Sequence, residues 1–298
     1  MAIKESWGDR LFHGLNTLFL LLLVAVVLYP LIFIVSGSFS DPAYVNSGQM
    51  WLLPKGVTLE GYKLVFGNPD IWTGYRNSLL YTAGGVMINL SVTITCAYAL
   101  SRKDLAGRNA FMFFILFTMF FSGGLIPSYL LVKSLGLVNS YWALVLPSAA
   151  SVMNIVVSRT FFQSTIPREL EEAAEMDGCS NFRLFFQIVL PLSKPILAVM
   201  ALFYGVGHWN QYFSALIYLS DRGKYPLQLF LREILVQQEM SEQMLPAGAD
   251  LELMSEKARV AELVKYAVMM IAALPLLCAY PFVQRFFVQG VMIGSIKQ

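Results

Sequence analysis

The stretch Glu172-Ala173-Ala174-Glu175-Met176-Asp177-Gly178, followed by Ile188-Val189-Leu190-Pro191, is polar sequence held between long apolar segments. A chain this apolar is expected to keep its non-membrane loops short and without pattern. Residues 164–194 instead have the spacing of two small amphipathic helices joined at a glycine. The loop therefore predicts a surface built for a partner. An ordinary amphipathic loop that packs on its own helical bundle is the alternative.

The first of these two helices has clear start and stop signals. Ser164 or Thr165 is expected to cap it, because a hydroxyl at that position accepts a hydrogen bond from a free N–H of the first turn. Pro167 and several acids stand in the first turn, as they do at many helix starts: Glu169, Glu171 and Glu172. Gly178 is expected to adopt the left-handed conformation that ends the helix. One face carries Leu170, Ala173, Ala174 and Asp177.

The second helix is expected to restart at Ser180 or Asn181. Its apolar face is predicted to consist of Phe182, Phe185, Phe186 and Val189. Pro191 and Pro195 then lead into the next apolar segment. Small alanines on the first helix would let the surface of another protein come close, and the flanking acids offer charge partners.

Composition sets the class of the protein. Hydrophobic residues make up 57% of the 298, and charged residues only 13%, against roughly 25% charged in soluble domains. Mean hydropathy is +0.60. A net charge of +2 without a long basic tract argues against a nucleic-acid partner. The cysteines lack metal-ligand spacing, so we expect free thiols and no metal site at Cys96, Cys179 and Cys278.

Membrane-spanning helices need about 20 mostly apolar residues. Six stretches qualify, at residues 12–35, 78–100, 110–132, 141–162, 196–219 and 263–283. The first could be a signal peptide, but it is longer than the apolar part of one and lacks a convincing cleavage site. The sequence therefore predicts an all-α integral membrane protein with six spans, forming one domain over residues 1–298.

Lysine and arginine fall on alternate sides of these spans, which predicts that both termini are cytoplasmic. The loop at residues 164–194, before span five, is then cytoplasmic as well. Residues 37–76 and 220–262 are predicted to be external. Within the second external segment, residues 227–235 have the periodicity of a helix lying on the outer surface, and Pro246-Ala247-Gly248-Ala249 is predicted to be a loop.

Enzymatic chemistry finds little support. No Gly-x4-Gly-Lys-(Ser/Thr) phosphate loop is present, so the chain cannot supply an ATP site. No nucleophile–base pair points to catalytic residues. An ion-coupled secondary transporter would need ionisable groups at membrane depth. His208 is the mid-membrane candidate, with Lys265 near the end of span six.

Polar and aromatic residues within the spans could instead line a path for a solute. Aromatic faces stack on sugar rings and amides pair with hydroxyls, so such a lining suits sugars. The alternative is that these side chains make hydrogen bonds between helices without contacting a substrate. The candidates are Asn89, Asn154, His208, Trp209, Asn210 and Tyr212.

The run Glu172-Ala173-Ala174-x-x-Asp177-Gly178, then nine residues, then Ile188-x-Leu190-Pro191 resembles the signature of permease subunits of bacterial ATP-driven (ABC) importers. In that family the loop is the coupling helix, which sits in a cleft of the cytosolic ATPase. The resemblance implies docking by Glu172, Ala173, Ala174 and Gly178. It extends the expected coupling surface to Glu169, Asp177, Phe182, Leu190 and Pro191.

Other segments resemble the carbohydrate-importing branch. Trp209-Asn210-x-Tyr212 is similar to a Trp-Asn-(Glu/Asp)-Phe segment, but Gln211 stands where an acid is commoner. Tyr225-Pro226-Leu227-Gln228 and Gly290-Val291-Met292-Ile293-Gly294 resemble permeases for complex oligosaccharides, including those from pectin and alginate. A non-sugar solute is the alternative, as is the ion-coupled carrier.

The resemblance also implies the assembly. The partners would be a second, homologous permease, a dimer of ATPase subunits, an external solute-binding protein and the lipid bilayer of the bacterial inner membrane. This chain would bind no cofactor, since ATP and Mg²⁺ would be held by the ATPase.

Overall fold

A computed structural model describes residues 6–243 and 251–293 of the chain, and within them it contains helices and no strand. The described part is therefore all-helical, as predicted. It divides into two compact units. Unit 1 draws on residues 1–68 and 233–274, and unit 2 on residues 69–232 and 275–298. That the whole chain is one domain stays a prediction.

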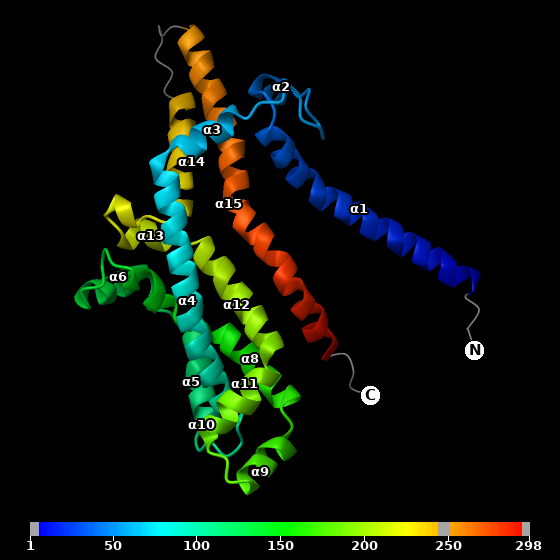
Figure 1. Ribbon diagram of the computed structural model, residues 1–298, viewed down its shortest axis with the longest axis vertical. Helices are drawn as coiled ribbons and strands as arrows, with labels where there is room; N and C mark the ends of the chain where they lie inside the picture. Colours follow the sequence, from blue (N-terminus) through cyan, green and yellow to red (C-terminus); the bar gives the residue numbers. More distant parts are fainter. Residues whose placement is uncertain (1–5, 244–250, 294–298) are drawn as a thin grey trace. The chain divides into compact units, whose positions relative to one another are not determined.

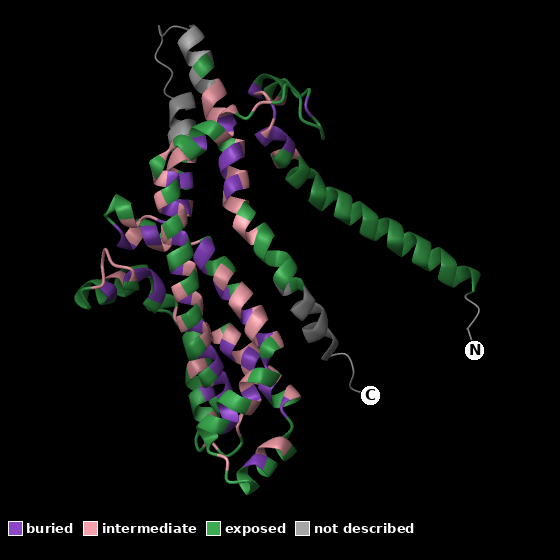
Figure 2. Cartoon of the chain, viewed as in Figure 1, coloured by how far each residue is buried: buried purple, intermediate pink, exposed green. Residues whose placement is uncertain are grey.

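Unit 1 begins with the long apolar helix α1 (Trp7–Ser38). The Ser6 hydroxyl accepts a hydrogen bond from the Asp9 N–H at 3.2 Å, and the Asp9 carboxylate accepts one from the Ser6 N–H at 3.0 Å. This capping box satisfies N–H groups that the first turn leaves free. Figure 2 shows α1 exposed along most of its length. An apolar helix with no polar face has the composition of a membrane span.

The rest of unit 1 comprises α2 (Pro42–Asn46), α3 (Glu60–Gly67), the end of α14 (Leu227–Gln243) and the first part of α15 (Leu251–Ile293). Helices α3 and α15 approach closely at Gly61, where an added Cβ would lie 2.5 Å from the Leu263 carbonyl oxygen. Arg259 of α15 forms an ion pair with Glu60 of α3 at 3.2 Å. The close contact and the ion pair together hold α3 on α15.

Unit 2 is built around α4 (Pro69–Ser101), which packs against α8 (Val152–Thr165) and α12 (Lys194–Trp209) (Figure 1). Polar groups contribute to this packing. The hydroxyls of Thr93 in α4 and Tyr204 in α12 lie 2.6 Å apart in a buried site. Such interhelical hydrogen bonds matter in a membrane, where the hydrophobic effect does not draw helices together.

Three helices are long and apolar enough to be continuous spans: Trp7–Ser38, Pro69–Ser101 and Arg259–Phe282. Three further spans appear only if bent pairs are counted, which gives up to six. The six predicted spans therefore equal the largest number that the described helices allow. The cytoplasmic placement of both termini stays a prediction.

The bent pairs differ from the straight spans that the apolar runs predict. Helices α5 (Arg108–Phe120) and α6 (Leu125–Ser134) meet at 114°, and α7 (Trp142–Val145) with η1 (Leu146–Ser148) meets α8 at 52°. The first bend contains Gly124 at φ +83°, a conformation that side chains disfavour. The third pair, Asn181–Leu192 with α12, meets at 79°. Span five is also interrupted, because α12 ends at Trp209 and α13 (Phe213–Tyr218) begins after residues 210–212.

Helix α14 confirms the predicted helix at residues 227–235, and its start is buried against the protein. Leu227, Leu229, Phe230 and Leu231 are buried. The Leu227 N–H donates to the Ser78 hydroxyl of α4 at 2.8 Å, and the short helix η3 (Arg222–Lys224) precedes it. The first turn of α14 is thus packed on α4, and its placement on the external side of the membrane stays a prediction. The predicted loop at residues 246–249 lies outside the described residues.

Candidate functional site

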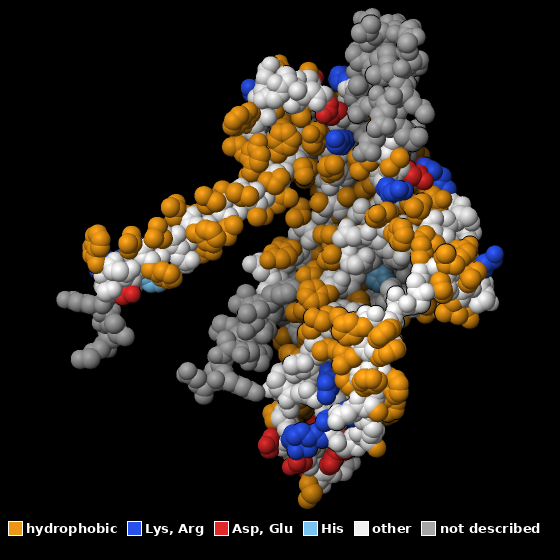
Figure 3. Space-filling view, turned by 180° about the vertical axis from the view of Figure 1, so that it is seen from behind, with side chains coloured by type: hydrophobic (Ala, Val, Ile, Leu, Met, Phe, Trp, Pro, Cys, Tyr) orange, Lys and Arg blue, Asp and Glu red, His pale blue; other side chains and the backbone are white. Residues whose placement is uncertain are grey.

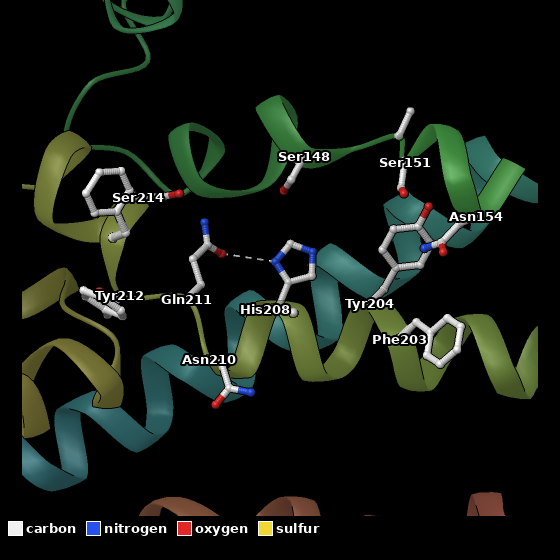
Figure 4. Close-up of a pocket in the computed structure, with 13 residues that line it drawn as sticks. Ser148, Ser151, Asn154, Phe203, Tyr204, His208, Asn210, Gln211, Tyr212 and Ser214 are labelled. Atoms are coloured by element: carbon white, nitrogen blue, oxygen red, sulfur yellow. Dashed lines mark hydrogen bonds between the residues drawn. The ribbon is translucent and has the colours of Figure 1, made fainter. Parts of the chain in front are cut away.

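A cavity of about 570 Å³ opens in unit 2 where two helices break. On one side α12 ends at Trp209, and on the other the chain passes from η1 to α8 (Figure 4). Helix breaks at membrane depth leave backbone polar groups free and are tolerated where they line a cavity. The polar side chains that line it include Ser148, Ser151, Asn154, Tyr204, His208 and Gln211.

His208 is held at the edge of this cavity by two amide side chains. Its Nε2 lies 2.7 Å from Asn89 Oδ1, and its Nδ1 lies 3.3 Å from Gln211 Oε1. The amide nitrogens are engaged elsewhere, since Asn89 donates to the Ser148 carbonyl and Gln211 donates to the Leu144 carbonyl. Both amide oxygens must therefore face the imidazole. At each contact the ring nitrogen is the possible donor, because an amide oxygen only accepts.

The approach of α4 to α12 at this point depends on glycine. A Cβ at Gly85 would overlap the His208 ring. Asn89 lies one turn further along α4 and is fully buried. The His208 ring thus packs against the backbone at Gly85, and an amide oxygen lies at each of its nitrogens. These contacts fix the orientation of the ring without a bound solute.

The predicted path residues divide into three groups. Asn154, His208, Asn210 and Tyr212 line the cavity, and Asn89 lies behind it as the partner of His208. Trp209 is buried, with its ring centroid 5.9 Å from that of Tyr75, and does not line the cavity. For Asn89 and Trp209 the structure thus shows contacts between helices.

Sequence reasoning missed several lining residues. Tyr204 stands one turn before His208, so helical spacing could have found it. Gln211 was noted only as a departure from a family pattern. Ser148 and Ser151 lie at the break that follows Pro147, and this proline with the two serines was the signal that could have found them.

The loop at residues 164–194 contains α9 (Arg168–Met176), α10 (Asn181–Leu184), the π-helical turn η2 (Phe185–Val189) and α11 (Leu190–Leu192). The expected cap by Ser164 or Thr165 is wrong. Both residues belong to α8, and α9 starts after Pro167 without a side-chain cap. Ser180 does cap α10, as predicted, by accepting from the Arg183 N–H.

Gly178 ends α9 in the predicted left-handed conformation, at φ +71°. The Cys179 N–H donates to the Ala174 carbonyl at 2.9 Å, and the Gly178 N–H donates to the Glu175 carbonyl at 3.0 Å. These two bonds form a Schellman motif, which satisfies carbonyls that the last turn would leave free.

The predicted apolar face of the second helix is split. Phe185 and Val189 are buried in a core with Ala97 and Tyr98 of α4 and Phe162 of α8. Phe182 and Phe186 are exposed and stack on each other at 6.4 Å. Pro191 has no N–H to offer to the carbonyl four residues before it, which favours irregular winding just ahead of it. The turn at η2 is wider than an α-helical turn and rotates the side chains away from α-helical register.

Most of the predicted coupling residues are on the outside of the loop. Exposed positions are Glu169, Glu172, Ala173, Asp177, Gly178, Phe182 and Pro191, and Leu190 is half-buried. Ala174 is buried in the same core as Phe185. Its small side chain lets α9 lie close to its own bundle, so it is not part of the exposed surface.

Arg102, just beyond the end of α4, ties α9 to the bundle. Its guanidinium donates two hydrogen bonds to Asp104, at 2.8 and 2.9 Å, and one to Glu175 of α9 at 3.0 Å. The hydrogen bond from Arg102 lowers the pKa of Asp104, and the one to Asp104 raises the pKa of Arg102. The Arg102 guanidinium therefore stays charged, and its hydrogen bond to Glu175 holds α9 in place.

Comparison with known proteins identifies relatives over nearly the whole chain. Residues 71–293 match the family described as "Binding-protein-dependent transport system inner membrane component". Protein LplC of Bacillus subtilis (strain 168) is 41% identical over 296 residues, covering 99% of this chain and 98% of that protein. The polygalacturonan/rhamnogalacturonan transport system permease protein YtcP of the same organism is 40% identical, covering 99% of this chain and all of that protein (100%).

A solved structure is similar as well. It is the crystal structure of a bacterial ABC transporter involved in the import of the acidic polysaccharide alginate. The likeness has a TM-score of 0.83 at 33% identity, and it covers 96% of this chain and 100% of the other.

Proposed function

Since the chain belongs to the family of binding-protein-dependent transport system inner membrane components, the permeases of bacterial ABC importers, we propose that it moves oligosaccharides across the bacterial cytoplasmic membrane. Uptake is driven by ATP, which a partner ATPase binds with Mg²⁺ and hydrolyses. This chain supplies the path and no catalytic group.

The cavity at the break of α12 is the observation that carries this proposal. Its lining combines hydroxyl, amide and imidazole groups with the aromatic rings of Phe203, Tyr204 and Tyr212. Such a mixture suits a sugar, which presents hydroxyls at its rim and C–H groups on its faces. We place the sugar against Asn154, His208, Asn210 and Tyr212. Asn89 and Gln211 hold His208 in position.

The substrate class is proposed to be uronate-containing oligosaccharides. The support is the relatives named for polygalacturonan/rhamnogalacturonan and for alginate, both acidic polysaccharides. No lysine or arginine is among the described residues that line the cavity. A carboxylate there is received by uncharged amide and hydroxyl donors of the lining.

The loop at residues 164–194 is proposed to dock on the ATPase. Its exposed face offers acids on α9, before Gly178, and the stacked rings of Phe182 and Phe186, after Gly178. Closure of the ATPase dimer moves this loop, which opens the path to the outside, and hydrolysis resets it. A second, homologous permease completes the path, and an external solute-binding protein delivers the sugar.

Competition for uptake tests the substrate class. Membrane vesicles that contain the complete transporter take up a labelled galacturonate trimer, and unlabelled oligosaccharides are added. We expect galacturonate oligomers to compete and neutral maltooligosaccharides of equal length not to. Equal competition by the neutral sugars would contradict uronate selectivity.

The competing hypothesis is an ion-coupled carrier that uses His208. Its specific support is that the described residues lining the cavity include one histidine, His208, and no aspartate or glutamate. His208→Gln keeps a hydrogen-bonding group of similar size but cannot carry a proton. We expect this change to alter mainly the apparent affinity for the sugar. Loss of uptake with normal sugar binding would favour the carrier.

A further inference from the structure

Unit 2 has a second cavity, of about 340 Å³, which shares no residue with the one at the break of α12. It lies among the end of α4, the start of α5, the end of α8 and the start of α9. Four basic side chains line it, those of Arg102, Lys103, Arg108 and Arg168, against the single acid Glu171. We refer to this cavity as the basic pocket.

Two of these cations are already engaged. Arg102 is paired with Asp104 and Glu175, and Arg108 donates to the Arg102 carbonyl at 3.3 Å. Within residues 6–243 and 251–293, no hydrogen bond or ion pair is found for the side chains of Lys103 and Arg168. Glu171 accepts from the Tyr98 hydroxyl at 3.4 Å. The pocket therefore holds more positive charge than its own acid balances.

Helix ends add to this positive potential. Arg108 is the first residue of α5 and Arg168 the first of α9, and neither helix start is capped by a side chain. Uncapped N–H groups and the positive end of the helix dipole both favour an anion. Glu169 and Glu171 offset the dipole of α9. The first turn of α5 holds no acid, so its end stays uncompensated.

The position of the basic pocket indicates what kind of anion reaches it. Ser101, at its edge, is the last residue of the continuous span Pro69–Ser101. Buried Phe162 and Ile166 form an apolar floor beside the charges. Figure 3 shows basic and acidic side chains gathered at the α9 end of this unit, next to apolar surface. Charges at the end of a span lie at the depth of lipid headgroups.

We propose that the basic pocket binds a phosphate group, carried by an anionic phospholipid. Lys103 and Arg168 supply the free charges, and Arg108 adds a third positive charge beside them. Because Arg168 opens α9, a bound phosphate joins the start of α9 to the end of α4. On the transport function proposed above, such a lipid would set how firmly the coupling loop is held. Phosphate binding itself does not depend on that function.

Spin-labelled lipids measure the binding directly. The full chain is placed in nanodiscs of phosphatidylcholine that contain a small share of spin-labelled phosphatidylglycerol, and the motionally restricted fraction is titrated. We expect phosphatidylglycerol to be restricted in preference to labelled phosphatidylcholine. Lys103→Ala with Arg168→Ala should weaken this preference about thirtyfold, from the loss of two basic contacts. The pair Lys103→Arg and Arg168→Lys should retain it.

Lys194→Ala is the matched control, since Lys194 is an exposed lysine at the start of α12 outside the basic pocket. The proposal would be overturned if Lys194→Ala weakened the preference for phosphatidylglycerol as much as the double variant, or if the double variant kept this preference. Displacement of the lipid by millimolar inorganic phosphate would assign the pocket to free phosphate and overturn the lipid source. Unchanged lipid binding with loss of ATPase copurification in the double variant would assign the pocket to a protein contact instead.

Discussion

Phe182 and Phe185 stand three residues apart, yet they face opposite ways. Phe182 is 79% exposed, whereas Phe185 is 8% exposed and lies 5.1 Å from the Tyr98 ring. Phe182 and Phe186 together form an exposed apolar surface, which is typical of a contact with a partner. On the proposed docking of the loop, the two positions therefore separate binding of the ATPase from stability of the fold.

Alanine substitutions at these two positions should have opposite effects. Phe182→Ala should leave the free energy of unfolding within about 0.5 kcal/mol of wild type and weaken ATPase binding about tenfold, as for loss of an aromatic anchor. Phe185→Ala should cost about 3–5 kcal/mol, because it empties part of the core. Thermal unfolding and ATPase copurification measure both. Normal ATPase binding by Phe182→Ala would remove this residue from the docking surface.

Gly178 decides the shape of the loop at the scale of the element. Its φ of +71° disfavours any side chain, although nothing lies within 4 Å of the position of a Cβ. Gly136, after α6, has φ +69° and equally open surroundings. Alanine at either site should cost about 1–2 kcal/mol of backbone strain.

Comparing the two glycines isolates the role of the loop. Gly178→Ala should lower ATP-driven uptake severalfold, because α9 and α10 lose their relative direction, while Gly136→Ala should leave uptake near wild type. The measurement is initial uptake at equal amounts of inserted protein. Equal uptake by the two variants would show that the bend at Gly178 is not needed to couple the ATPase to transport.

Sequence reasoning found the local signals of this loop and failed where packing decides. Gly178 and Ser180 were predicted because end and cap signals depend on a few neighbouring residues. The inward turn of Phe185 depends on the π-helical turn before Pro191, which helical periodicity does not reveal. The bend at Gly124 and the breaks beside the cavity do carry break signals, such as Gly123-Gly124 and Pro147-Ser148, but the high hydropathy of the segments outweighed them when the spans were predicted.

At the scale of the whole molecule, the alternation of basic residues predicts that residues 164–194 are cytoplasmic and residues 37–76 external. Asn46 and Asn181 are both exposed, so cysteines there report the side of the membrane. Cys96, Cys179 and Cys278 are first replaced by serine to remove background. Asn46→Cys should react with an impermeant reagent in intact cells, and Asn181→Cys only after the membrane is opened. The reverse pattern would invert the predicted topology.

On the proposed function, this chain forms the path of an ATP-driven importer. The most direct test is uptake of a labelled galacturonate oligomer into proteoliposomes that hold the complete transporter, with the binding protein outside and ATP inside. We expect uptake to require ATP, to continue when a protonophore removes the proton gradient, and to persist in His208→Gln with a changed apparent affinity. Uptake that ignores ATP, collapses with the proton gradient and is lost in His208→Gln would contradict an ATP-driven importer and show an ion-coupled carrier.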